Sequence, residues 1–114
     1  MRPMGVDHRR YSRKALAVDF AGRDGSGTGL LIFTSADVSA GGAFLKSELL
    51  LEQGETLSLE FHLEGRREPI RARANVVWVR RFPEPNQPAG MGVEFVSIDD
   101  EDRAALVALV DGDP

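Results

Sequence analysis

Two short segments of the chain hold the side chains with the clearest capacity for chemistry. The first is "RRYSR", residues 9–13, in which Arg9 and Arg13 lie four positions apart with Arg10 between them. A guanidinium group presents five donors in a planar fork, so it can hold a phosphate at two points, hydrogen-bond the O6 and N7 edge of guanine, or stack on a base. The same arginines also fit a solvated tail, or one that pairs with acidic side chains elsewhere.

The second segment is "DVSAGG", residues 37–42. The carboxylate of Asp37 can accept hydrogen bonds from N1 and N2 of guanine, and the hydroxyl of Ser39 can bind a base or a phosphate. Gly42 leaves space for a ligand to approach the backbone closely. Asp and Ser also close strand connections in Asx and Ser turns without any ligand. Taken alone, this segment is compatible with either role.

The rest of the sequence offers little for catalysis. The two histidines, His8 and His62, have no further metal ligand at a suitable spacing, and the chain has no cysteine. No Gly-x-Ser-x-Gly motif is present to supply a serine nucleophile. We therefore expect a protein that is not an enzyme, with no catalytic residue, no metal ion and no cofactor.

Length, composition and charge restrict the class of protein further. The 114 residues suffice for one domain, and the lack of cysteine and of any long apolar segment predicts a cytoplasmic chain that does not insert into a membrane. The net charge of −4 disfavours DNA or RNA as a partner. Residues 1–14 hold five cationic side chains and one carboxylate, a net charge of +4, which leaves −8 for residues 15–114. Such local positive charge suits a small anion.

Alternation of apolar and polar residues predicts the strands that must position these segments. The expected strands cover residues 14–20, 30–36, 42–45, 56–65, 69–82 and 91–98. Glycine-rich residues 21–29 and proline-rich residues 83–88 are expected loops. Acidic residues followed by apolar residues at helical spacing predict a short helix over 99–110. Short strands with one late helix favour an antiparallel barrel or sandwich.

The same alternation predicts the core. One face of the fourth expected strand carries Leu57, Leu59, Phe61 and Leu63. One face of the fifth carries Ile70, Ala72, Ala74, Val76 and Trp78. Because the side chains of one face point to the same side of a sheet, we expect both sets, Phe61 and Trp78 included, to lie in the core.

Together, residues 9–13 and 37–42, which we call the two chemical segments, resemble the signature motifs of the PilZ domain family, written Arg-x-x-x-Arg and Asp/Asn-x-Ser-x-x-Gly. Their order, the strand and turn between them, and "GMGVEF" at residues 90–95 before the helix extend the resemblance through nearly the whole chain. The resemblance implies an all-β fold, a six-stranded antiparallel β-barrel with a short C-terminal α-helix. It also implies that the ligand is the bacterial second messenger cyclic di-GMP.

The resemblance assigns the ligand contacts to Arg9, Arg10, Arg13, Asp37, Ser39 and Gly42. The arginines would contact phosphates and guanine, with Arg10 as an auxiliary contact, and the other three residues would form the barrel-side half of the site. The implied organisation is a flexible arm over residues 1–13, a barrel with its helix over 14–110 and a tail over 111–114. The arm would lose conformational entropy as it folds over the ligand.

From the resemblance we expect a stand-alone receptor that relays the level of cyclic di-GMP to an unidentified effector protein, in control of motility, surface polysaccharide or development. The main alternative is a PilZ-like interaction module with weak or no nucleotide binding. A purely structural β-domain and a small barrel that binds single-stranded nucleic acid are more distant alternatives. Such a barrel needs exposed aromatic side chains that stack on bases, whereas Trp78 and Phe61 are expected in the core. A homodimer is left open.

Overall fold

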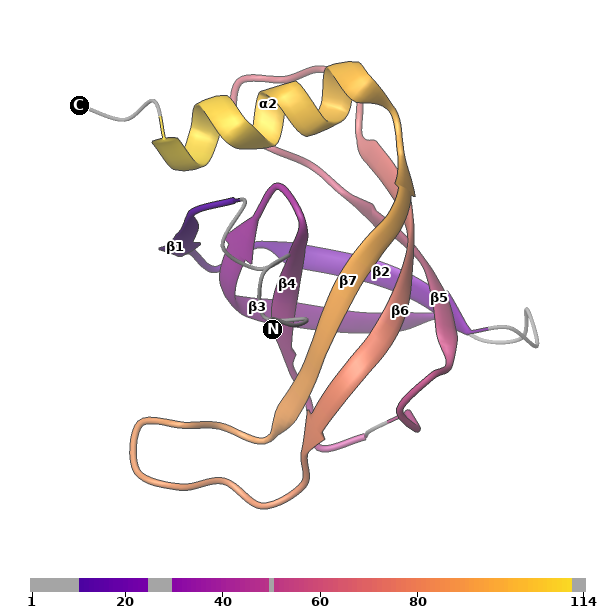
Figure 1. The fold of residues 1–114 in the computed structure, drawn as a ribbon, viewed down its shortest axis with the longest axis vertical. Coiled ribbons are helices and arrows are strands. Elements are labelled where there is room, and N and C mark those ends of the chain that lie inside the picture. Colours follow the sequence, from indigo (N-terminus) through magenta and orange to yellow (C-terminus); the bar gives the residue numbers. More distant parts are fainter. Residues whose placement is uncertain (1–10, 25–29, 50, 112–114) are drawn as a thin grey trace, which may run out of the picture.

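The alternating segments form antiparallel strands that close into a barrel. This is seen in a computed structural model, which describes residues 11–24, 30–49 and 51–111 (Figure 1). The elements are β1 (Arg13–Ala15), β2 (Asp19–Asp24), β3 (Leu31–Ser39), β4 (Gly42–Lys46), β5 (Thr56–Phe61), β6 (Ile70–Arg80), β7 (Gly90–Ile98) and α2 (Asp100–Asp111). Strands β3, β2, β5, β6, β7 and β4 pair in that order, and β4 pairs again with β3. The predicted six-stranded barrel with a C-terminal helix is therefore confirmed, with β1 as one extra strand on β3.

Inward-facing side chains fill the barrel as the alternation predicts. Leu57, Leu59 and Phe61 of β5 are buried, and so are the alternate residues of β6 from Ile70 to Val76. The ring of Phe61 lies between Phe20 of β2 and Phe95 of β7, with ring centroids 4.2 Å and 6.0 Å away. These three rings join strands from both sides of the barrel, so they hold its closed form.

The expected first strand over residues 14–20 is wrong in two respects, because the chain breaks between β1 and β2 and because β2 continues to Asp24, into the expected loop. Both short strands pair with the same edge of β3, and residues 16–18 bridge them. The buried hydroxyl of Ser35 accepts a hydrogen bond from the Val18 N–H at 2.9 Å and donates one to the Leu16 carbonyl at 2.6 Å. This single side chain satisfies backbone groups that a continuous ladder would otherwise pair.

Strand β3 is longer than expected and runs to Ser39, so the start of "DVSAGG" lies in a strand rather than after one. Its last residues pair with β1 on one edge and with β4 on the other. Residues 40–41 then form the tight turn into β4. The segment "DVSAGG" therefore lies in the β3–β4 hairpin, in which β3 also pairs with β1 and β4 also pairs with β7.

Helix α2 lies across one end of the barrel (Figure 1). Its residue Leu106 is fully buried against the core, and Arg66, in the connection before β6, donates to Asp102 in its first turn at 3.1 Å. The predicted C-terminal helix is therefore confirmed. Within the described residues, no helix has the length and apolar character needed to span a membrane.

Candidate functional site

Strand pairing brings the two chemical segments side by side. Arg13 of β1 lies opposite Ser39 of β3, and Ala15 lies opposite Asp37. The guanidinium Nε of Arg13 is 3.6 Å from Oδ1 of Asp37. A basic and an acidic side chain from separate motifs thus meet on one edge of the barrel. Arg9 and Arg10, the other arginines of the first motif, lie outside the described residues.

The carboxylate of Asp37 keeps an unused acceptor. Its Oδ1 is buried and has no hydrogen-bond partner, since 3.6 Å to Arg13 exceeds the usual N–H···O range. Both side chains remain about one third exposed, at 39% for Arg13 and 34% for Asp37. An ion pair that is this long and this exposed contributes less than about 1 kcal/mol. A ligand can therefore replace the contact between Arg13 and Asp37 at little energetic cost.

Ser39 and Gly42 shape the hairpin that carries Asp37. The buried hydroxyl of Ser39 accepts hydrogen bonds from the N–H groups of Gly41 at 3.0 Å and Gly42 at 3.1 Å, which is a Ser turn. A Cβ at Gly42 would collide with the carbonyl oxygen of Val93 on β7, so the absence of a side chain allows β4 to pair with β7. Contact of either residue with a ligand stays a prediction.

A cavity of about 420 Å³ opens beside the Arg13–Asp37 pair. Its wall includes Phe44 of β4, Trp78 and Arg80 of β6, and residues 86–88 of the connection between β6 and β7. The cavity therefore presents two guanidinium groups, one carboxylate and two aromatic rings. This set of groups matches a planar, anionic ligand better than an apolar one.

Trp78 belongs to this wall and not to the core, so the prediction from alternation is wrong for this residue. A register shift between Val76 and Trp78 breaks the period of two in β6, and the Trp78 side chain is 37% exposed. Its indole ring stacks on Phe44 with centroids 5.1 Å apart and an interplanar angle of 22°. Any Cβ at Gly92 would collide with the indole, so this glycine makes room for it.

The guanidinium of Arg80 contacts both aromatic rings of the cavity wall. Its guanidinium carbon lies 5.2 Å from the centre of the Phe44 ring and 5.1 Å from that of Trp78. Its Nη1 donates to the carbonyl of Pro88 at 3.1 Å, which holds the following loop in place. The cation–π contacts and the hydrogen bond to Pro88 hold the guanidinium in place, and its other N–H donors remain available to a ligand. Sequence reasoning missed it because neither motif includes it.

Helix α2 contacts both chemical segments through one arginine. The guanidinium of Arg103 lies 5.4 Å from the centre of the Tyr11 ring and donates to the carbonyl of Ala40 at 3.1 Å. The Tyr11 ring in turn lies so close to Gly41 that a Cβ there would be only 2.9 Å from it. A displacement of the segment around Tyr11 would therefore act on the hairpin and on the helix together. Within the part of the chain that the structure describes, no three His, Asp or Glu side chains group as metal ligands.

Known structures share this fold. The chain resembles the inhibitor of motility MotI/DgrA of Bacillus subtilis with a TM-score of 0.75 and 23% identity, covering 96% of this chain and 50% of that one. It therefore spans about half the length of that protein. The PilZ domain of YcgR from Escherichia coli, a structure with cyclic di-GMP, gives a TM-score of 0.65 and 17% identity over 90% and 88% of the two chains.

A third structure and two sequence comparisons complete the assignment. The PilZ domain of CeSA from a cellulose-synthesizing bacterium gives a TM-score of 0.60 and 18% identity, over 89% of this chain and 96% of that one. A search of curated proteins found no match. The family model of the PilZ domain matches residues 7–112, nearly the whole sequence. The chain therefore belongs to the PilZ domain family.

Proposed function

We propose that the protein is a receptor for cyclic di-GMP that regulates a partner protein. The observation that carries the proposal is the meeting of Arg13 and Asp37 beside the cavity with its aromatic wall. Cyclic di-GMP has two phosphates and two guanines, so its site needs cationic donors for the former and acceptors for the latter. Membership of the PilZ family, and the YcgR domain whose structure holds this nucleotide, support the same ligand.

In this proposal the ligand replaces the Arg13–Asp37 ion pair. Arg13, together with Arg9 and Arg10 of the preceding segment, binds the phosphates and the O6 and N7 edge of guanine. Asp37 then accepts from N1 and N2 of the base through the acceptor that is unused without ligand. Trp78 offers the face on which a guanine stacks. Ser39 and Gly42 hold the hairpin in the shape that presents Asp37.

Changing Asp37 to alanine tests the recognition of the base. Guanine presents the N1 and N2 donors that a carboxylate binds, whereas adenine lacks this pair, and such a two-point contact is worth about 1–3 kcal/mol of discrimination. We expect the wild type to bind cyclic di-GMP more tightly than cyclic di-AMP, and Asp37→Ala to lose about tenfold or more of that preference. Isothermal titration calorimetry with both nucleotides measures the ratio.

The matched control for this experiment is Asp19→Ala. Asp19 of β2 is exposed and accepts a hydrogen bond from Thr34, and its removal changes the net charge by the same amount. It should leave the preference for guanine unchanged. A wild type that does not bind cyclic di-GMP would refute the proposed function, whereas binding with equal selectivity in Asp37→Ala would remove only the role of this carboxylate.

Changing Trp78 to alanine tests the stacking face. Stacking of a base on an aromatic side chain is worth about 1–3 kcal/mol, so we expect the affinity for cyclic di-GMP to fall about tenfold. The control is Phe82→Ala, because Phe82 follows the same strand, is 79% exposed and does not line the cavity. Thermal melting of both variants checks that they fold. Equal affinities of the two variants would place the bases elsewhere.

The proposed output is control of motility through contact with an effector protein. The relative MotI/DgrA is named an inhibitor of motility, which supports the motility part of this proposal. The route from ligand to surface begins at Tyr11, which lies inside the arginine motif and contacts Arg103 of α2. An arm that closes on the nucleotide would pull on Tyr11 and alter the contact that holds the helix to the hairpin. The alternative is an interaction module that works without nucleotide, and calorimetry of the wild type separates the two.

A further inference from the structure

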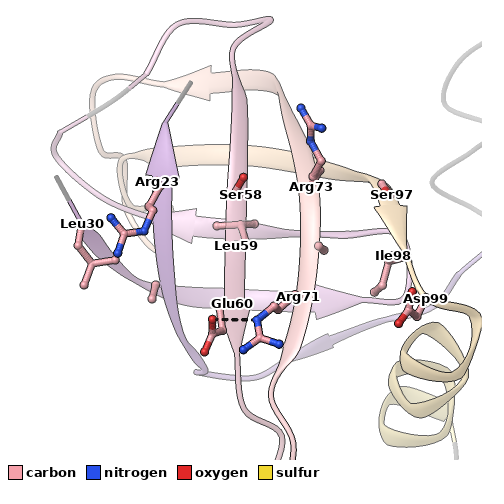
Figure 2. Close-up of a pocket in the computed structure, with 12 residues that line it drawn as sticks. Arg23, Leu30, Ser58, Leu59, Glu60, Arg71, Arg73, Ser97, Ile98 and Asp99 are labelled. Atoms are coloured by element: carbon pink, nitrogen blue, oxygen red, sulfur yellow. Dashed lines mark hydrogen bonds and ion pairs between the residues drawn. The ribbon is translucent and has the colours of Figure 1, made fainter. Parts of the chain in front are cut away.

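A second hollow, of about 540 Å³, lies on the outer face of the barrel (Figure 2). It shares no lining residue with the cavity beside Arg13 and Asp37. Strand register places Arg23 of β2 opposite Ser58 of β5, Ser58 opposite Arg73 of β6, and Arg73 opposite Ser97 of β7. The serines are short, so the arginines of this row stand on either side of a shallow floor. Beside Ser58 in the adjacent row, Arg71 donates to Glu60 at 3.2 Å.

We call Arg23, Ser58, Arg71 and Arg73 the arginine hollow, and it carries excess positive charge. All four residues are exposed, and only Arg71 has an acidic partner. Among residues 11–24, 30–49 and 51–111, neither Arg23 nor Arg73 forms an ion pair. Leu30, 54% exposed, lines the hollow beside Arg23 (Figure 2). A hollow that is lined by two unpaired guanidinium groups and, beside one of them, an exposed leucine is suited to an acidic protein segment.

The rim of the same hollow carries the opposite charge. Strand β7 ends there, and Asp99 together with Asp100 and Glu101, the first two residues of α2, forms what we call the acidic turn. Asp99 lines the hollow, and all three side chains are exposed without an ion-pair partner among the described residues. The dipole of α2 explains why acidic residues occur in its first turn. It does not explain why two unpaired arginines line the same hollow.

We propose that the arginine hollow of one copy of this chain receives the acidic turn of a second copy. A two-fold axis between a basic surface and an adjacent acidic surface places each surface against its complement, which is the requirement for an isologous dimer. The acidic turn carries three carboxylates and the hollow carries two unpaired guanidinium groups, so the charges of the two surfaces agree. Nucleic acid or an anionic membrane fits less well, because Glu60 and Asp99 lie in the hollow and the chain carries a net charge of −4.

Sedimentation velocity of the full chain, without nucleotide, gives the first test. We expect a concentration-dependent equilibrium between monomer and dimer. Raising the salt from about 0.1 M to about 1 M shortens the Debye length from about 10 Å to about 3 Å. The dissociation constant of the dimer should therefore rise at least about tenfold. A wild type that stays monomeric at every concentration in low salt overturns the proposal, and then leaves a different, acidic partner as the occupant of the hollow.

Charge exchange gives the decisive test. One variant carries Arg23→Glu and Arg73→Glu, and the other carries Asp100→Lys and Glu101→Lys. Each variant alone places like charges at both contacts of the dimer, so its dissociation constant should rise at least about tenfold. Mixed in equal amounts, the two variants have opposite charges at both contacts, and they should form a heterodimer at least as tight as the wild-type dimer.

The control carries Lys46→Glu and Arg81→Glu. These two exposed cations line a different hollow, and their reversal changes the net charge by the same amount as the arginine variant. The control should dimerise like the wild type. Dimerisation of the arginine variant with unchanged affinity, or failure of the mixed variants to associate while thermal melting shows both folded, overturns the proposal. Neither result bears on the nucleotide site, which is tested by calorimetry.

Discussion

Replacing both Arg9 and Arg13 with alanine is expected to lower the affinity for cyclic di-GMP by about 100-fold or more. Hydrogen bonds to charged groups contribute about 1.5–3 kcal/mol each, and the double change leaves the phosphates without two of their charge-assisted donors. The change also leaves Asp37 without its charge partner at 3.6 Å. Isothermal titration calorimetry of the wild type and the double variant, at one salt concentration, measures the difference.

The control for the double variant must remove two positive charges elsewhere. Arg67→Ala with Arg81→Ala does so at exposed positions that do not line the cavity beside Arg13 and Asp37. If the loss of affinity came from the net charge alone, both double variants would bind equally weakly. We expect the control to bind nearly as tightly as the wild type, because screening removes most of the effect of distant surface charges. Equal binding by the wild type and Arg9→Ala with Arg13→Ala would contradict the proposed site.

The fold was predictable because its pattern is local. In β5, buried Leu57, Leu59 and Phe61 alternate with exposed Ser58 and Glu60, so the strand's orientation can be read directly from the sequence. Where one face of a strand is buried, a shift of one residue would expose every apolar side chain, and this penalty fixes the register. Arg13 and Asp37 were singled out for a different reason, namely the resemblance of their segments to the motifs of a known family, and their contact with a ligand stays a prediction.

The remainder depends on contacts that a linear pattern does not contain. Trp78 leaves the core because a bulge in β6 shifts the alternation, and a bulge has no reliable sign in a sequence that stays apolar on both sides. The break after β1 depends on Ser35, a residue about twenty positions away. The row of Arg23, Ser58 and Arg73 exists only once three strands are paired in register. Each of these features is decided by pairing between distant segments.

Phe61→Ala is expected to lower the free energy of unfolding by about 3–5 kcal/mol. Phe61 is 2% exposed, and its ring contacts Phe20 on one side and Phe95 on the other. Removing it creates a cavity between strands β2 and β7, which cannot collapse without opening the barrel. Urea denaturation followed by circular dichroism measures the change, with an unchanged slope against denaturant as the sign of two-state unfolding.

The neighbouring substitution His62→Ala separates loss of the core from loss of any side chain at this point of the chain. His62 is exposed, so its removal should change the free energy of unfolding by less than about 0.5 kcal/mol. A loss below about 0.5 kcal/mol for Phe61→Ala as well would show that this ring does not hold the barrel closed.

Because small domains are stable by only about 5–15 kcal/mol, the loss expected for Phe61→Ala would leave a protein close to its unfolding transition. Under the proposed function, cyclic di-GMP would then stabilise the variant, since a ligand that binds only the folded state shifts the equilibrium toward it.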